Sequence, residues 1–159
     1  MDICWRHFEK KSGRPIGFVN VAEGGVTSYR WKPGTDFFMR LKNAIEEDNP
    51  RAVLWHQGES DCAERIRPED SYANRLDMIK ESSSNEKLTW VAALATLDGD
   101  KGCQVRSTQS KIIQEGVALE GPDTDLLSKT AGHFTTKSEL RQHGKAWSQK
   151  MEEYFYQLG

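Results

Sequence analysis

The stretch Ala52–Cys62, AVLWHQGESDC, indicates the fold of this chain more directly than any other part of it. Four apolar residues are followed at once by a polar run from His56 to Asp61. The pattern predicts a buried strand that ends in a polar loop, and ligands of open α/β sheets bind where strands end. Such a strand holds polar groups rigidly, as catalysis requires. A strand followed by an ordinary polar turn explains the same pattern, because short apolar strands commonly lead into such loops.

Apolar runs and helical patterns alternate on both sides of this stretch. We expect strands at Ile16–Ala22, Ala52–Trp55 and Leu88–Ala95, with a weakly signalled fourth at Asp125–Ser128. Apolar residues at helical spacing predict helices at Asp2–Lys11, Gly34–Asn49, Pro68–Ser82, Val105–Gly116 and Ser138–Leu158. Strands alternating with helices predict one domain, residues 1–159, built as a three-layer α/β/α sandwich with a mostly parallel sheet.

The composition narrows the class of protein. The chain has 159 residues, of which 36% are hydrophobic and 29% charged, which is enough for a sizeable core. The formal net charge is −2 with both signs mixed along the chain, so no basic block argues for nucleic acid. The N-terminus is polar and unlike a signal peptide, and no segment approaches the roughly 18 apolar residues of a membrane helix. We therefore expect a cytoplasmic globular protein without a membrane or nucleic-acid partner.

The cysteines lack a recognisable pattern. Cys4, Cys62 and Cys103 are odd in number and show no CxxC or ligand-like spacing. They predict neither a disulfide framework nor a zinc site, and a reducing compartment fits them slightly better. No ligand cluster is visible, so we expect no metal and no other cofactor.

Four segments are expected to meet at the carboxyl edge of the sheet. They are Gly24-Gly25, His56–Asp61, Asp98–Gly102 and the loop ahead of the last helix, which contains His133. Paired glycines allow a close approach of the backbone that other residues resist, although an ordinary turn explains them equally simply.

Histidine is the usual side-chain base near neutral pH, and a carboxylate fixes its tautomer and stabilises its charged form. Glu59 or Asp61 could be that carboxylate for His133, while Gln57 and a glycine amide are suitable donors to an oxyanion. A loop or helix-start histidine would look the same in sequence. His143, in a predicted helix, is assigned no role.

These residues resemble a known family. Trp55–Asp61, WHQGESD, resembles the third sequence block of SGNH hydrolases, and most closely the carbohydrate O-acetylesterase branch of sialate O-acetylesterase-like proteins and family 6 acetylxylan esterases. Three further matches follow the order of the family: Arg14–Trp31 resembles its second block, Val105–Gln109 the helix after its fourth strand, and His133-Phe134 with Gly144–Trp147 its histidine loop and closing helix. The resemblance implies an SGNH-type, flavodoxin-like sandwich.

The resemblance also implies site roles. They are a catalytic base at His133, an acid at Glu59, oxyanion-hole donors at Gln57 and at Gly24 or Gly25, and a structural or substrate-facing neighbour at His56. Many SGNH hydrolases place an aspartate three residues before the histidine, where this chain has Thr130. This departure favours Glu59 as the acid.

The first block of the family, a strand and a GQSN- or GDS-like turn with the nucleophilic serine, has no counterpart in this sequence. Ser28, just beyond Gly25, is the candidate substitute nucleophile, and a partner chain or a water activated by His133 are the alternatives. The first strand of the family lies inside its sheet. We therefore expect an abridged sheet that closes up or is completed by another chain, as in a homo-oligomer.

Two functions follow from the resemblance. The first is an esterase-like hydrolase that removes acetyl groups from carbohydrate hydroxyls or acts on another small ester. The second is a non-catalytic relic, serving as a carbohydrate-binding or oligomeric interaction module. A truncated gene whose longer version carries the serine block is a third explanation.

Overall fold

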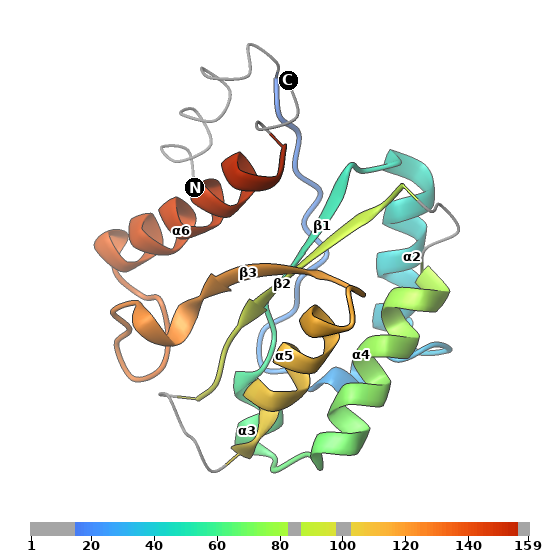
Figure 1. The fold of residues 1–159 in the computed structure, drawn as a ribbon, viewed down its shortest axis with the longest axis horizontal. Coiled ribbons are helices and arrows are strands. Elements are labelled where there is room, and N and C mark those ends of the chain that lie inside the picture. The colour runs from blue at the N-terminus through green and yellow to red at the C-terminus, as the bar shows by residue number, and fades with distance from the viewer. Residues whose placement is uncertain (1–14, 83–86, 98–102, 156–159) are drawn as a thin grey trace.

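The computed structural model describes residues 15–82, 87–97 and 103–155 (Figure 1). The predicted helix at Asp2–Lys11 and the predicted loop at Asp98–Gly102 lie outside the described residues. The elements in chain order are η1 (Ser28–Trp31), α2 (Asp36–Asp48), β1 (Ala52–Trp55), α3 (Glu59–Ala63), α4 (Pro68–Ser82), β2 (Thr89–Leu94), α5 (Val105–Gln114), β3 (Leu119–Asp123), η3 (Thr124–Leu126) and α6 (Lys137–Phe155).

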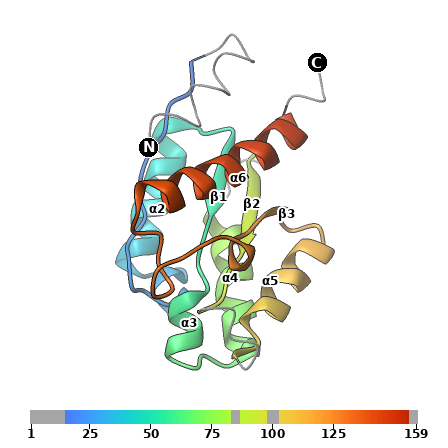
Figure 2. The same ribbon diagram turned by 90° about the vertical axis from the view of Figure 1, so that its left-hand side faces the viewer.

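The sheet is parallel, with the strand order β1-β2-β3. Successive side chains of a strand point to opposite faces of the sheet, so those of β2 pack into two separate cores. Trp90 and Ala92 belong to a core built with α2, α4 and α5, whereas Val91 and Ala93 pack with Trp147 of α6. Figure 2 shows α6 in front of the sheet and α4 and α5 behind it. The predicted three-layer α/β/α fold is confirmed.

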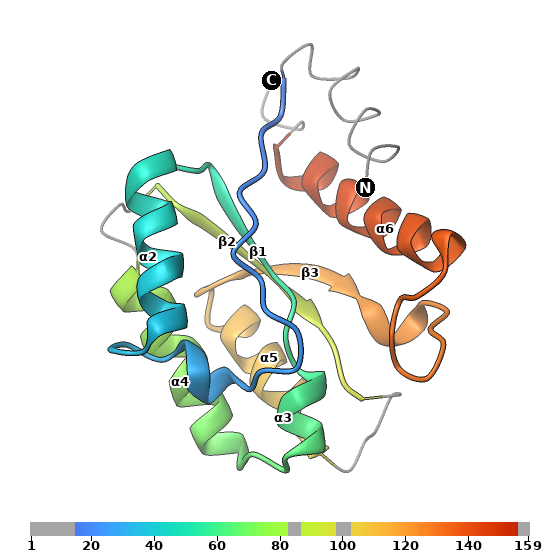
Figure 3. The ribbon, with the colours of Figure 1, turned by 180° about the vertical axis from the view of Figure 1, so that it is seen from behind.

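The predicted strand at Ile16–Ala22 is wrong. Residues 15–23 contain no strand, and Figure 3 shows them as an irregular blue trace that passes β1. Its apolar residues are divided between core and solvent: Val21 packs against the core, while Phe18 and Val19 are exposed. The segment does not close the sheet, because β2 is the strand paired with β1 in the described residues.

The predicted strand at Asp125–Ser128 is also wrong, since β3 precedes it at Leu119–Asp123 and Thr124–Leu126 forms a 3-10 helix. Gly121 and Pro122 inside β3 look like a turn in sequence. In the fold, Gly121 allows β3 to approach β2 closely, because a Cβ there would lie 2.8 Å from the carbonyl carbon of Ala92. Pro122 is tolerated because β3 is an edge strand.

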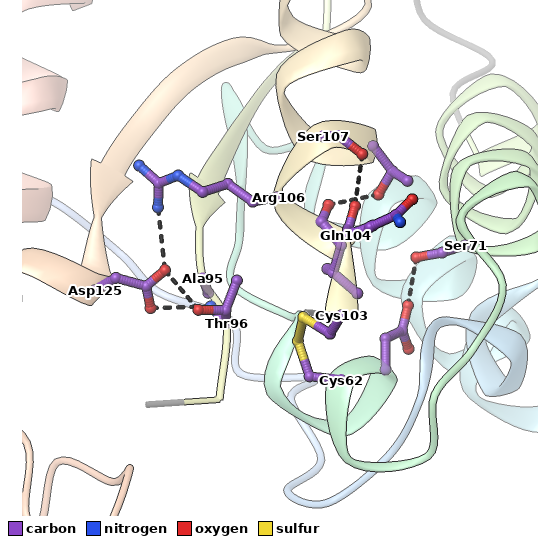
Figure 4. The surroundings of a disulfide bond; sticks show 12 residues. Cys62, Ser71, Ala95, Thr96, Cys103, Gln104, Arg106, Ser107 and Asp125 are labelled. Atoms are coloured by element: carbon purple, nitrogen blue, oxygen red, sulfur yellow. Dashed lines mark hydrogen bonds and ion pairs between the residues drawn. A yellow bond between two sulfur atoms is a disulfide. The ribbon is translucent and has the colours of Figure 1, made fainter. Parts of the chain in front are cut away.

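The expectation that the cysteines form no disulfide is wrong as well. Cys62 and Cys103 are joined by a disulfide with a Cα–Cα distance of 4.9 Å, which ties α3 to the segment entering α5 (Figure 4). Because disulfides persist in oxidising compartments, the cysteines no longer favour a reducing one. No helix among the described residues is long and apolar enough to span a bilayer.

Gly58, directly after β1, is required by close packing. A Cβ at this position would lie 2.0 Å from the carbonyl oxygen of Ala95 and 2.6 Å from Nε2 of Gln109. We expect Gly58→Ala to lower the free energy of unfolding by at least about 2 kcal/mol, since backbone must shift to admit the methyl group. Denaturant unfolding measures this value. Gly17→Ala is the matched control, because a Cβ at Gly17 meets no atom within 4 Å; equal losses in both variants would contradict the packing argument.

Candidate active site

The carboxyl end of β1 places a histidine between a carboxylate and a second histidine. His56 follows β1, and its Nε2 lies 3.0 Å from Oε1 of Glu59, the first residue of α3. Its Nδ1 lies 3.2 Å from Nε2 of His143, which lies in α6, 87 residues further along the chain. We call His56, Glu59 and His143 the histidine cluster. Since the side chains of His56 and Glu59 are 22% and 23% exposed, solvent reaches the cluster.

Aromatic and hydroxyl groups surround this cluster. The indole N–H of Trp147 donates to Nε2 of His143 over 3.2 Å. The ring of Phe134, next to His133, lies 4.5 Å from the ring of His143 between centroids. Oγ1 of Thr124, just after β3, lies 3.4 Å from Nε2 of His56. The cluster thus lies where β1, β3 and the loop before α6 meet.

The charges of the cluster follow from these contacts. Burial alone would raise the pKa of Glu59, but the hydrogen bond and the charge of His56 outweigh it and lower this pKa to about 2. Burial lowers the pKa of His143 to about 4, and the charge of His56 acts in the same direction. At neutral pH, Glu59 is therefore a carboxylate and His143 a neutral imidazole.

Asp61, the other carboxylate considered for the base, belongs to a buried ion pair instead. It is fully buried, and its Oδ2 lies 3.1 Å from Nη1 of Arg75, which is 3% exposed. The carboxylate also accepts hydrogen bonds from Ser71 Oγ, Gln57 Nε2 and the Ser28 N–H. Burial would raise the pKa of Asp61, but Arg75 and the hydrogen bonds from Ser71 and Ser28 lower it. Asp61 is therefore the centre of a buried network below the site, which includes Arg75, Ser71, Gln57 and Ser28.

The predicted oxyanion donors are used in different ways. Nε2 of Gln57 donates to Asp61, and its Oε1 accepts from Arg75, so this side chain faces the buried network. Gly24 and Gly25 form an exposed turn, and Gly25 has the positive φ of 72° that glycine adopts readily. The turn is open to solvent, whereas the side-chain amide of Gln57 is hydrogen-bonded to the buried residues Asp61 and Arg75.

Ser28, the candidate nucleophile, is 1% exposed. Its Oγ accepts a hydrogen bond from Nδ2 of Asn74 in α4 over 3.3 Å. No hydroxyl among the described residues is hydrogen-bonded to a ring nitrogen of His133. The structure therefore does not bring Ser28 and the predicted base together.

His133 lies on the loop beside the histidine cluster, with its side chain exposed. Its backbone is fixed by two hydrogen bonds with Thr130, of 2.9 and 3.0 Å between N and O. The structure thus joins Glu59 to His56 rather than to His133, and His143, which sequence reasoning left without a role, completes the cluster.

Glu139 is a further site residue that sequence reasoning missed. It accepts hydrogen bonds from the N–H groups of Thr135 and Thr136, each over 2.8 Å, and from Oγ1 of Thr130 over 2.7 Å. The Thr136 N–H and these other donors lower the pKa of Glu139 to about 2. Thr136 and Glu139 form a capping box at the start of α6, and the T-x-x-E pattern was the available signal. Glu139 thereby anchors both ends of the loop that carries His133.

Asp125 joins the ends of β2 and β3. It accepts hydrogen bonds from the N–H and Oγ1 of Thr96 over 2.9 and 2.8 Å, and it pairs with Arg106 (Figure 4). It also forms an ion pair with Lys129. This network fixes Lys129, whose charge contributes to the low pKa of Glu59. No group of three or more His, Cys, Asp or Glu side chains in the described part of the chain has an arrangement that could hold a metal ion.

Comparison with known proteins gives two findings. A family model described as carbohydrate esterase, sialic acid-specific acetylesterase, matches residues 4–153. A protein of Arabidopsis thaliana named as a probable carbohydrate esterase is 36% identical over 69 residues, which are 40% of this chain and 26% of that protein. The chain therefore covers about a quarter of the length of this relative. No solved structure matches the chain.

Proposed function

Because the chain belongs to the sialic acid-specific acetylesterase family of carbohydrate esterases, we propose that its site hydrolyses acetyl esters of carbohydrates. The observation that carries the proposal is the position of Glu59, held as a carboxylate at the carboxyl end of β1 beside the loop of the exposed His133. A carboxylate and a histidine at one sheet edge are the groups that acid–base chemistry on an ester requires.

In the proposed reaction His133 is the general base. It removes a proton from a nucleophilic hydroxyl or water, whose oxygen attacks the acetyl carbonyl and forms a tetrahedral oxyanion. The bond between the acetyl carbon and the sugar oxygen then breaks, and His133 returns the proton to the sugar oxygen. With water as the nucleophile this step releases acetic acid; with a hydroxyl, a water activated by His133 attacks the acetyl carbon of the newly formed ester in a second round and releases acetic acid. Glu59 keeps acceptor capacity for a donor of the loop or of the substrate, since only one of its carboxylate oxygens is bound to His56. The open turn at Gly24 and Gly25 offers backbone N–H groups to the oxyanion.

We expect His133→Ala to lower the turnover of a chromogenic acetate ester at least about 100-fold, the usual contribution of a positioned base. Ser28→Ala should lower turnover less than about threefold, because a buried Oγ that accepts from Asn74 is not poised for attack. Lys137→Ala, which changes an exposed residue four positions after His133, is the matched control and should leave turnover unchanged. An inactive Ser28→Ala variant with normal stability would identify Ser28 as the nucleophile and contradict this assignment. Inhibition of the wild type by a serine-reactive phosphonate would identify the nucleophile as a serine.

The buried position of Ser28 also favours a second candidate function, carbohydrate binding without hydrolysis. NMR titration with an O-acetylated sugar separates the two functions. Resonance shifts of the loop around His133 without release of acetate would support binding alone, whereas both together support hydrolysis.

We also propose that a second copy of the chain completes the sheet. The support is that β1 is an edge strand of the described sheet and that the segment passing β1 in Figure 3, residues 15–23, contains two apolar side chains, Phe18 and Val19, that are 53% and 56% exposed. Light scattering after size exclusion should then give twice the mass of the chain, and Val19→Lys should halve it. A monomer at every concentration tested would contradict the proposal.

A further inference from the structure

A surface pocket is formed by η1, the loop between α3 and α4, and the first turns of α4. Its volume is about 480 Å³, within the range of roughly 300–1,000 Å³ that is usual for small-molecule sites. No residue of the histidine cluster lines it, and the proposed reaction does not use it. We call it the basic pocket, and its lining includes Tyr29, Lys32, Arg65, Arg67, Asp70 and Asn74.

The lining of the basic pocket carries a surplus of positive charge. Three cationic side chains and one carboxylate line it, in a chain whose formal net charge is −2. The carboxylate is already engaged, because the oxygens of Asp70 lie 2.8 and 3.0 Å from Nε and Nη2 of Arg67. Lys32 and Arg65 form no ion pair with a carboxylate of the described residues. Two cationic groups therefore remain for an anionic ligand.

The backbone at Arg65 points to a role for its side chain. Its φ of 52° lies in the left-handed region, which residues other than glycine adopt sparsely. The N–H of Arg65 donates to the carbonyl of Cys62 over 3.1 Å, and the N–H of Ile66 donates to the carbonyl of Asp61 over 2.9 Å. These bonds form the Schellman motif at the end of α3, in which glycine is the usual residue at the position of Arg65. Arginine suits this backbone less well than glycine, but it places a guanidinium at the pocket.

An aromatic ring and an amide complete the lining. Tyr29 is 54% exposed, and Nζ of Lys32 lies 3.8 Å from the centroid of its ring. Nδ2 of Asn74 donates to Oγ of Ser28 over 3.3 Å, so the amide oxygen of Asn74 keeps its acceptor capacity. An aromatic ring packs against the C–H groups of a sugar, and an amide oxygen accepts from a sugar hydroxyl. The pocket thus combines groups for an anion with groups for a sugar ring.

We propose that the basic pocket is a second ligand site, which binds an acidic sugar unit and holds its carboxylate between Arg65 and Lys32. The guanidinium of Arg65 is a planar fork that fits a carboxylate with two hydrogen bonds, and the ammonium of Lys32 adds a point charge. The ring of Tyr29 and the amide of Asn74 contact the rest of the sugar. The choice of a sugar as the carrier of the carboxylate rests on the proposed function, whereas the affinity for an anion does not.

NMR titration of the whole chain with glucuronate, glucose and inorganic phosphate tests the proposal. Glucuronate should shift the resonances of Tyr29, Lys32 and Arg65 and bind at least about tenfold more tightly than glucose or phosphate. Arg65→Gly should weaken glucuronate binding at least about tenfold and keep the stability of the chain, because glycine suits the backbone at this position. Lys32→Met should weaken binding as well. Lys80→Met, which removes an exposed charge in the last turn of α4, is the matched control and should leave the affinity unchanged.

Three results would overturn the proposal. They are equal affinities for glucuronate and glucose, an unchanged affinity in a folded Arg65→Gly variant, and phosphate binding as tight as that of glucuronate, which would identify the ligand as a free anion. The release of acetate from O-acetylated sugars is measured separately. Release of acetate without glucuronate binding would refute the second site alone, whereas glucuronate binding without release of acetate would refute the proposed function alone.

Discussion

Asp61→Ala is expected to lower the free energy of unfolding by about 3–5 kcal/mol, the usual cost of removing one partner of a buried ion pair. Arg75, which is 3% exposed, would keep its charge without the carboxylate that lies 3.1 Å away. Ser71 and Gln57 would lose their acceptor at the same time. Because the native carboxylate has a lowered pKa, its contribution is fully present above the pKa of the unfolded chain, near 3.8, and is lost as the pH falls through the lower pKa of the folded state.

Urea unfolding at pH 7 measures this loss, and Asp70→Ala is the matched control. Asp70 pairs with Arg67 over 2.8 Å on the surface, where such pairs contribute about 0–1 kcal/mol. A loss below about 1 kcal/mol for Asp61→Ala, equal to that of the control, would show that Arg75 finds another partner or solvent. The stability of the buried network below the site would then not depend on Asp61.

Removal of the disulfide is expected to destabilise the chain by about 4 kcal/mol. The estimate follows from the 41 residues that separate Cys62 and Cys103, because the cross-link restricts this loop in the unfolded chain. The double variant Cys62→Ser/Cys103→Ser should therefore unfold at lower denaturant concentration than the oxidised wild type. The end of α3 and the entry to α5 should show the largest increase in hydrogen exchange.

The control for this prediction is a reductant added to both proteins. It should shift unfolding of the wild type to that of the double variant and leave the double variant unchanged. Equal stability of the oxidised wild type and the double variant would contradict the expected effect, as would a free-thiol titration that finds Cys62 and Cys103 reduced in the purified protein.

The parts of the fold that could be predicted are those with a strong local pattern. Ala52–Trp55 and Pro68–Ser82 have the predicted bounds, because an uninterrupted apolar run and a regular apolar stripe leave few alternatives. β3 was missed because Gly121 and Pro122 are turn residues; Gly121 is explained by the close contact with Ala92 in the neighbouring strand, and Pro122 by the edge position of β3. The apolar run at Ile16–Ala22 does not form a strand, since strand formation depends on a neighbour that no local pattern reveals.

The same distinction applies to the site. Glu59 was found because it lies within WHQGESD, three residues from its partner His56. His143 is 87 residues from His56, so only the packing of α6 on the sheet brings the two rings together. The disulfide was missed for the same reason, as the spacing of two cysteines says nothing about their distance in the fold.

The central claim is that this site, with Glu59 as its carboxylate, hydrolyses acetyl esters of carbohydrates. The most direct test is the amount of free acetate that the purified chain releases from an O-acetylated sugar, compared with Glu59→Gln of equal stability. We predict release by the wild type and its loss in Glu59→Gln, with no release from the corresponding N-acetylated sugar. Equal release by both proteins, or none above buffer for the wild type, would contradict the claim.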